Sequence, residues 1–567
     1  MRYRLSEFAI LLAFIFLTSC AQVKIVRPTL IDQDTFVKLS DKIDKTPANI
    51  QIPLKQEVQQ QSNSNLGNQL LVLDGYSSTV DGSLKNIIYN SGLAALNSDE
   101  GFDRVFSVVG NSDLAPVAYY STALANYLLQ ADYACRYPIY ESYFERRYKD
   151  HRTDRECASA VPFVVFSDMQ ADIRWIDPKK VSSIHLIFTS DGESIVSSFG
   201  HVSLRLVICP PGVDATDQNA CDRNLSDHVV LGFQAHVNDF SISVFKGLIG
   251  GYDTRLFANG FMDFYQTNAI SESRDVYSLP LLISSKDREY LVRSLSQIHW
   301  SYSKDYTFFT NNCTSTLQNT LGVLWQAMAK NPIMTTSYIR PDHFFENMKR
   351  SGLVDPNLLA DLNKAEELGY FFPNTRPVYE SAFSVVSKEI SFPKIDSLNE
   401  YLQLNPYQRF QYIKKDRSYF ETIAKNRYVL EAQLLIEEYS NIVYEKELLL
   451  HLAMYFEEND ILNRADEFRK SLSNDKFALL NSCVLAPLTA ITGKLPIMDG
   501  IPATNVSNNF QLNCPVSKRK QDFDTVLQIL SSVDQDGWKP IDTLVNDYRQ
   551  SMENILELEK FLPATQP

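Results

Sequence analysis

The sequence predicts an α+β protein in which a domain of mixed strands and helices is flanked by mainly helical N- and C-terminal regions. Three patterns lead to this prediction. Residues 184–208 contain an apolar run, a polar loop and a second run with alternating apolar residues, which is typical of two strands. Residues 313–323 carry apolar residues at helical spacing. Residues 400–475 contain long amphipathic runs, which indicate paired helices.

The chain opens with a predicted secretion signal. Residues 1–19 combine basic residues with an apolar stretch too short to span a membrane, and Cys20 follows directly. Leu17 and the small residues before Cys20 resemble a bacterial lipobox, which implies cleavage before Cys20 and lipidation of its thiol. Ala21 at the next position implies sorting to the outer membrane. We therefore expect a periplasm-facing lipoprotein held to the bacterial membrane by the lipid on Cys20.

The rest of the chain divides into four predicted parts. Residues 20–70 are rich in Gln, Ser and Asn and have no periodic apolar face, so they indicate a flexible tether. Residues 71–180 have a mainly helical pattern. Residues 181–354 are dominated by strand-like runs until Cys313, and residues 355–567 return to a helical pattern.

Composition and charge narrow the possible partners. The chain has 567 residues, of which 44% are hydrophobic, so it can bury several cores. Its formal net charge of −14 argues against nucleic acid as a partner and against broad contact with anionic lipid. The sequence shows no metal-ligand spacing of His and Cys residues, so we expect neither a catalytic metal nor another cofactor.

Two residues far apart in the sequence are candidates for catalysis. His201 begins the second of the predicted strands, and Cys313 lies at the start of a predicted helix. Unpaired N–H groups and the helix dipole lower a thiol pKa at such a position, and the same N–H groups can bind an oxyanion. Asn311 and Asn312 are expected to support this site or the oxyanion. A lone Cys and a lone His are, however, more often ordinary packing residues.

The cysteines single out the same thiol. In a secreted protein, pairs of cysteines tend to form disulfides, and proximity in sequence favours the closure of short loops. The pairs expected on this basis are Cys135–Cys157, Cys209–Cys221 and Cys483–Cys514, although proximity does not prove connectivity. Cys313 would then remain free, either buried and inert or reactive.

A third residue usually orients the base in a site of this kind. The strand-like segment 228–236 offers His228, Gln234 and His236, and the sequence does not choose among them. A further polar motif, Glu-Ser-Arg-Asp at residues 272–275, could form a buried ion-pair network or contact a substrate. We expect the structural role for that motif.

The stretch from Cys135 to about Val354 resembles a known family, the Lnb N-terminal periplasmic domain, formerly domain of unknown function 4105. The matching residues are Cys135-Arg136-Tyr137-Pro138, Cys157, Ser198-Phe199-Gly200-His201, Gly247-Leu248, Gly250-Gly251-Tyr252, Glu272-Ser273-Arg274-Asp275-Val276-Tyr277 and Tyr306 through Asn312-Cys313. The resemblance implies a circularly permuted relative of the papain-like NlpC/P60 fold, with Cys313 as nucleophile and His201 as base.

The chain departs from this family in two ways. Members that transfer an acyl chain carry membrane-spanning helices after the domain, whereas no long apolar run follows residue 20 here. Asn311 also stands where many relatives have an acidic residue. The expected activity is therefore stated broadly, as a thiol acyltransferase or hydrolase acting on an ester or amide of an envelope lipid or lipoprotein. The alternatives are a peptidoglycan amidase or endopeptidase, and a non-catalytic envelope scaffold.

Overall fold

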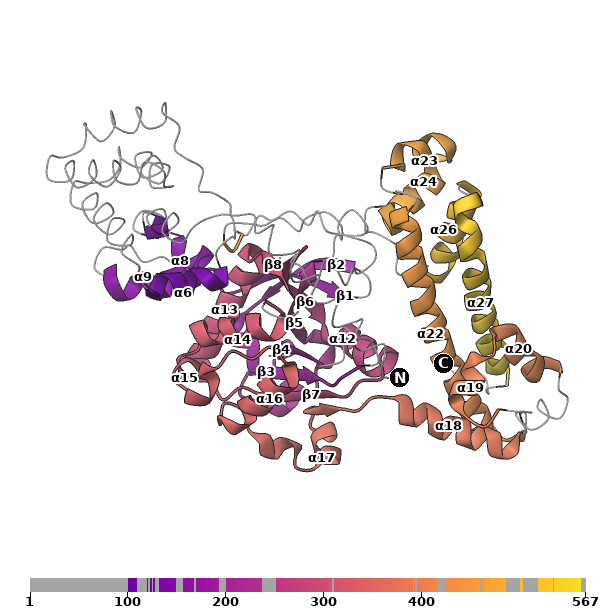
Figure 1. The fold of residues 1–567 in the computed structure, drawn as a ribbon, viewed down its shortest axis with the longest axis horizontal. Coiled ribbons are helices and arrows are strands. Elements are labelled where there is room, and N and C mark those ends of the chain that lie inside the picture. The colour runs from indigo at the N-terminus through magenta and orange to yellow at the C-terminus, as the bar shows by residue number, and fades with distance from the viewer. Residues whose placement is uncertain are drawn as a thin grey trace, which may run out of the picture. The chain divides into compact units, whose positions relative to one another are not determined.

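The computed structural model (Figure 1) describes part of the chain. The described residues are 100–109, 132–148, 157–167, 170–192, 200–236, 251–307, 311–390, 395–415, 425–458, 463–485, 519–533 and 535–561, with a few shorter pieces between them. Their contacts divide them into two units, a smaller one within residues 100–155 and a larger one mostly within residues 156–561. The predicted signal peptide, the tether, Cys20 and Cys514 lie outside the described residues, so the predicted Cys483–Cys514 disulfide does as well.

The smaller unit is helical, as predicted, and an aromatic cluster holds it together. Its helices are α6 (Glu100–Val109), α8 (Tyr133–Arg136) and α9 (Pro138–Tyr148), each of which the division into units cuts near one end. The ring of Phe102 lies 4.8 Å from that of Tyr120 in an edge-on contact, and Tyr120 lies 5.5 Å from Phe144. Edge-on aromatic pairs of this kind add stability beyond the area that they bury.

The larger unit is built around one mixed β-sheet. Within the described residues the sheet has nine strands in the order β2-β1-β6-β5-β4-β3-β7-β9, with β8 pairing with β6. Their bounds are β1 (Val161–Ser167), β2 (Gln170–Ile176), β3 (Val181–Thr189), β4 (His201–Ile208), β5 (Val229–His236), β6 (Tyr252–Gly260), β7 (Val276–Pro280), β8 (Lys304–Tyr306) and β9 (Phe371–Phe372). The β1–β6 pair is parallel, and the other pairs are antiparallel.

Helices cover both faces of this sheet, which explains why its central strands are almost continuously apolar. On one face lie α13 (Ser285–Ser301), α14 (Cys313–Leu324) and α16 (Pro341–Arg350), and on the other lies α12 (Phe261–Tyr265). Two consecutive residues of β3 show this. Ile187 belongs to a buried cluster with Phe261 of α12, while Phe188 stacks on Phe345 of α16. Neighbouring residues in a strand point to opposite faces, so both faces are packed.

The sheet extends further towards the N-terminus than the sequence predicted. Strands β1 and β2 lie within residues 71–180, where the pattern indicated mainly helix, and they form a hairpin at one edge of the sheet. The apolar run of β1 is only seven residues long. Periodicity alone cannot distinguish a buried strand of this length from a helical segment.

Two of the predicted disulfides are present. Cys135 is bonded to Cys157 and Cys209 to Cys221, with sequence separations of 22 and 12 residues. Cys313 is a buried free thiol. Short closures of this kind reduce the conformational freedom of the unfolded chain.

Apart from β9, which joins the sheet, the C-terminal part is helical, as predicted, and its longest helices pack against each other. The bounds are α17 (Leu362–Glu367), α18 (Arg376–Glu389), α19 (Leu398–Gln403), α20 (Pro406–Phe410), α22 (Arg427–Glu458), α23 (Ala465–Ser471), α24 (Asn474–Leu480), α26 (Arg519–Val533) and α27 (Gln535–Glu559). The long pair is α22 and α27. No helix in the described ranges is both long enough and apolar enough to cross a bilayer.

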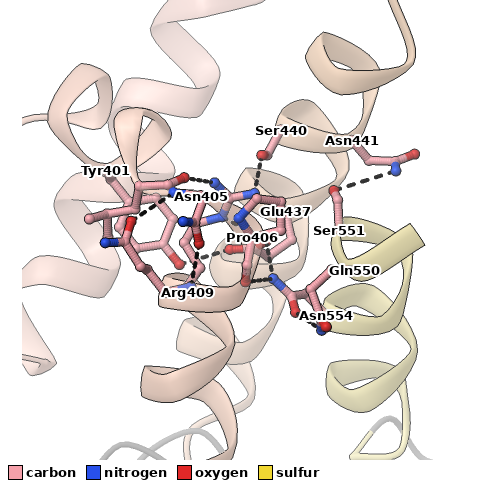
Figure 2. Close-up of polar contacts among 12 residues, drawn as sticks. Tyr401, Asn405, Pro406, Arg409, Glu437, Ser440, Asn441, Gln550, Ser551 and Asn554 are labelled. Carbon is pink, nitrogen blue, oxygen red and sulfur yellow. Dashed lines mark hydrogen bonds and ion pairs between the residues drawn. The ribbon is translucent and has the colours of Figure 1, made fainter. Parts of the chain in front are cut away.

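A buried polar cluster around Glu437 fastens four of these helices together (Figure 2). The Glu437 carboxylate accepts hydrogen bonds from the Tyr401 hydroxyl at 2.7 Å, from Arg409 Nε at 3.2 Å and from Asn554 Nδ2 at 3.3 Å. These donors come from α19, α20 and α27, and Glu437 itself lies on α22. The side chains of Arg409 and Glu437 are both fully buried. Arg409 also donates to the Ser440 hydroxyl.

Replacing Glu437 with Leu is expected to lower the free energy of unfolding by about 3–5 kcal/mol, because Arg409 would remain buried without its carboxylate. The double variant Arg409→Met/Glu437→Leu should recover most of this loss, since it removes both buried charges. Urea unfolding followed by circular dichroism measures both effects.

A matched control lies on the same helix. Arg427 and Glu431 form an ion pair at 2.8 Å whose side chains are 71% and 50% exposed, so Glu431→Leu should cost less than about 1 kcal/mol. If Glu437→Leu costs no more than Glu431→Leu, the buried cluster does not hold the helices together.

Candidate active site

Cys313 is the first residue of α14, as the sequence predicted, and the preceding residue caps the helix. The Asn312 side-chain oxygen accepts hydrogen bonds from the backbone N–H groups of Thr314 and Ser315, each at 3.0 Å. The Ser315 hydroxyl in turn accepts from the Asn312 N–H at 3.0 Å, which completes a capping box. The Asn312 amide donates to the Ile339 carbonyl at 2.9 Å. Both ends of the Asn312 side chain are therefore engaged in holding the helix start.

Asn311 supports the same turn from the other side. Its amide nitrogen donates to the Asp305 carbonyl at 2.7 Å and its side-chain oxygen accepts from the Thr316 hydroxyl at 2.9 Å. Its backbone N–H and carbonyl pair with those of Thr307. The structure thus places Asn311 and Asn312 as supports for Cys313, with their side-chain polar groups directed to neighbouring protein atoms.

His201 is the first residue of β4, where a glycine allows the chain to enter the sheet. Gly200 has a φ of +82°, and a Cβ at this position would lie 2.4 Å from the Thr189 carbonyl oxygen. Only glycine tolerates both constraints. Thr189, the last residue of β3, is the direct cross-strand partner of His201. The end of β3 therefore determines the backbone position of His201.

The structure brings His201 and Cys313 together. Burial acts to raise the pKa of the Cys313 thiol, but the charge of His201 and a hydrogen bond from it act in the opposite direction. Smaller contributions come from Thr314 and the backbone of Val202, and the net effect is a pKa below the ordinary value. The thiolate is thus more populated near neutral pH than in an ordinary cysteine.

The second ring nitrogen of His201 lies beside β5. His201 Nε2 is buried and has no hydrogen-bond partner within the described part of the chain. A Cβ on Gly232 would lie 3.3 Å from His201 Nε2 and 3.6 Å from Gln234 Nε2. The β4–β5 ladder pairs Leu204 with Leu231, and continuing this register brings Gln234 opposite His201. Gln234 is therefore the suggested third residue that lies next to the imidazole.

Of the other two candidates, His228 lies elsewhere, whereas His236 follows two residues after Gln234 on the same face of β5. His228 is buried and accepts hydrogen bonds from Arg205, with Nε–Nδ1 at 3.0 Å, and burial followed by Arg205 lowers its pKa to about 3. The β4–β5 register places it six residues along the strand from His201, about 20 Å at the usual strand rise. His236 is buried and stacks on Phe257, with ring centroids 6.0 Å apart. The structure does not bring His228 to the cysteine.

Two neighbours of the pair had no predicted role. Tyr306 is at the end of β8, just before the antiparallel pairing of Thr307 with Asn311, which folds the chain back towards Cys313. Burial, and then the charge of Cys313, raise the pKa of Tyr306, so its phenol stays protonated. Gly232 leaves space for the His201 ring. An isolated glycine within a strand often marks such a close approach, and that signal was present in the sequence.

A histidine at a strand start beside a buried free cysteine at a helix start defines a Cys–His pair of the kind that thiol enzymes use. Residues 168–341, which include both members of the pair, match the family model described as the Lnb N-terminal periplasmic domain. The resemblance predicted from the sequence is confirmed for this segment, which is less than a third of the chain. The match indicates an envelope-associated, periplasmic protein. The chain matches no curated protein and no solved structure.

No group of three or more His, Cys, Asp or Glu side chains in the described part of the chain is placed to hold a metal ion. The chemistry that the site itself offers is that of a lowered-pKa thiol, an imidazole in contact with it and the N-terminal end of a helix. In thiol enzymes, groups of these kinds can act as nucleophile and proton acceptor. Of the first N–H groups of α14, those of Thr314 and Ser315 are taken by the Asn312 side chain.

Gly232→Ala should slow alkylation of Cys313 by iodoacetamide at pH 6.5 by about threefold to tenfold, which corresponds to up to about 1.4 kcal/mol of barrier. The new methyl group would press on His201 Nε2 at 3.3 Å and displace the ring from the thiol. The rate is measured by mass spectrometry of the Cys313 peptide.

Gly322→Ala is the matched control, because a Cβ there meets nothing within 4 Å. It lies within α14 and should leave the alkylation rate unchanged while stabilising the helix by about 0.5–1 kcal/mol. Equal alkylation rates in the Gly232→Ala and Gly322→Ala variants would mean that His201 does not depend on the space at Gly232.

Proposed function

We propose that this protein is a lipid-anchored periplasmic thiol enzyme that attacks an ester or amide carbonyl of the cell envelope through Cys313. The observation that supports this most directly is the contact of His201 with the buried Cys313 at the start of α14, which lowers the pKa of the thiol. A structural cysteine has no need of such a partner. The envelope location follows from the family match.

The proposed reaction has two halves. The Cys313 thiol transfers its proton to the His201 ring and its sulfur bonds to the carbonyl carbon, giving an oxyanion that the backbone N–H of Cys313 at the start of α14 can bind. The carbonyl–oxygen or carbonyl–nitrogen bond then breaks, and His201 returns the proton to the leaving group. An amine or water next gives its proton to His201, attacks the thioester and releases Cys313. Transfer to an amine makes the protein an acyltransferase, and transfer to water makes it a hydrolase.

We assign one neighbour, Gln234, to this scheme. The side-chain oxygen of Gln234 would accept the Nε2–H of His201, which fixes the tautomer of the imidazole. The order of a histidine strand followed by a cysteine helix supports the permuted papain-like arrangement that the family resemblance implies. The acyl group is that of an envelope lipid or lipoprotein. Cleavage of a peptidoglycan amide is the alternative outcome of the experiment below.

The wild-type protein incubated with an envelope extract should carry an acyl mass on Cys313 that hydroxylamine at neutral pH removes, because hydroxylamine cleaves thioesters. Cys313→Ser and His201→Ala should carry no such mass. Intact-mass spectrometry and peptide mapping identify the adduct, and its mass distinguishes a fatty acyl chain from a peptidoglycan fragment.

The variants also separate the enzyme from a scaffold. Iodoacetamide should label wild-type Cys313 at pH 6–7 much faster than a free thiol with a pKa of about 8.5, and His201→Ala should slow this labelling. If Cys313 labels only after denaturation, and if both variants keep full biological function, the domain is a non-catalytic binding module.

The membrane anchor is a separate part of the proposal, supported by Leu17-Thr18-Ser19-Cys20. Growth of the producing bacterium with an alkyne fatty acid should tag the wild-type protein and not Cys20→Ala, because the lipid would be attached to that thiol. The tag is read on a gel after click labelling. Equal tagging of the two proteins would rule out the lipoprotein anchor.

A further inference from the structure

The Glu-Ser-Arg-Asp motif immediately before β7 is built into an unusual turn. Ser273 has a φ of +53° and is the one described non-glycine residue with a positive φ. Such a conformation is uncommon outside glycine and is kept only where the surroundings enforce it. The next residue, Arg274, has a side chain that is 6% exposed. The turn therefore places a guanidinium inside the domain.

The guanidinium of Arg274 donates hydrogen bonds to backbone carbonyls at the end of β3. Its Nε donates to the Ser190 carbonyl at 2.7 Å, and its Nη2 reaches the Thr189 carbonyl at 3.5 Å. Nη1 donates to Glu272 Oε2 at 2.9 Å and lies 3.4 Å from Asn268 Oδ1. Arginine presents several donors in one rigid plane, so one side chain can hold two adjacent carbonyls and its own turn together.

Asp275 joins the same segment from the neighbouring position. The Ser190 N–H donates to the Asp275 carbonyl at 2.8 Å, and the Asp275 N–H donates to the Ser190 hydroxyl at 3.0 Å. The Asp275 carboxylate accepts two hydrogen bonds from Asn374, both at 2.8 Å. The end of β3 is thus held by the motif through both backbone and side-chain contacts.

This held segment is the one that sets the position of His201. Thr189 is the cross-strand partner of His201, and the Cα of Gly200 packs so closely on the Thr189 carbonyl that a Cβ would lie 2.4 Å from its oxygen. The Thr189 carbonyl, which Arg274 reaches, is therefore also the group on which Gly200 packs just before β4 begins. Any movement of Thr189 and Ser190 would carry His201 with it.

We propose that Arg274 is a positioning residue for His201, which holds the imidazole at Cys313 by binding the Thr189 and Ser190 carbonyls. This inference rests on the proposed function of the Cys–His pair and adds a residue to its machinery. Arg274 acts through Thr189, Ser190 and the β3–β4 pairing and does not touch the substrate. Its loss would loosen the pair while the sheet remains folded.

The test is the pH dependence of Cys313 alkylation by iodoacetamide in the wild-type protein, Arg274→Gln and Arg274→Lys. A loosened imidazole lowers the thiol pKa less, so Arg274→Gln should shift the inflection towards about 8.5. At pH 6 its rate should fall about tenfold, the change that corresponds to one pKa unit. Arg274→Lys keeps the charge but loses the fork, and it should fall between the two. The groups that face Cys313, namely His201, Thr314 and Tyr306, are unchanged in these variants.

Arg293→Gln is the matched control. Arg293 also binds two successive carbonyls, those of Ala158 and Ser159 at 3.1–3.2 Å, but it does so beside β1. The Arg293→Gln variant should keep the wild-type pH profile of Cys313 alkylation even if its unfolding midpoint falls. A shift in Arg293→Gln as large as in Arg274→Gln would show a general loss of stability and overturn the proposal.

The remaining outcomes are also decisive. A wild-type profile in folded Arg274→Gln, checked by circular dichroism, overturns the positioning role. If Arg274→Gln does not fold, Arg274→Lys decides: an intermediate profile supports the role and a wild-type profile overturns it. If the wild-type protein itself reacts only with an ordinary thiol profile, the proposed Cys–His function fails, and that result is distinct from a failure of Arg274 alone.

Discussion

The antiparallel pairing of β3 with β4 is the constraint on which the candidate site depends. It places His201 opposite Thr189, and the missing side chain of Gly200 lets the two strands meet at that point. Both strands are buried on both faces, so a slip of one residue would turn apolar side chains from one packed layer to the other. Packing on both faces fixes the register of β3 and β4, and this register in turn fixes the position of the His201 imidazole.

Cys313 is positioned by a different means, the local chemistry of a helix start. The Asn312 cap and its reciprocal bond with Ser315 define where α14 begins, and the helix then packs on β4 and β5. The thiol thus lies in the first turn, where N–H groups have no partner within the helix and the Asn312 side chain accepts two of them. The pair forms where a strand register and a helix cap meet, and Gly232 leaves space on β5 for the His201 ring.

Three buried arginines each connect separate segments of this protein, and each has different partners. Arg409 is matched by the carboxylate of Glu437. Arg205 has His228 and backbone carbonyls around it, and its guanidinium lies 4.4 Å from the centroid of the Phe261 ring. Arg274 binds mainly carbonyls at the end of β3. A buried guanidinium is stable only when its donors are satisfied, so each of these residues ties distant segments together.

Much of the architecture and of the site could be predicted from sequence, because it depends on short-range patterns. Alternation identified β4, helical spacing after Asn312 identified α14, and cysteine proximity identified the Cys135–Cys157 and Cys209–Cys221 bonds. Tertiary structure alone distinguished Gln234 from His228 as the neighbour of His201 and gave Arg274 its carbonyl partners. Tertiary structure also decided that residues 161–167, predicted to be in a mainly helical region, form strand β1. The physical reason is that strand pairing and burial join residues far apart in sequence, and no local pattern records which side chains then meet.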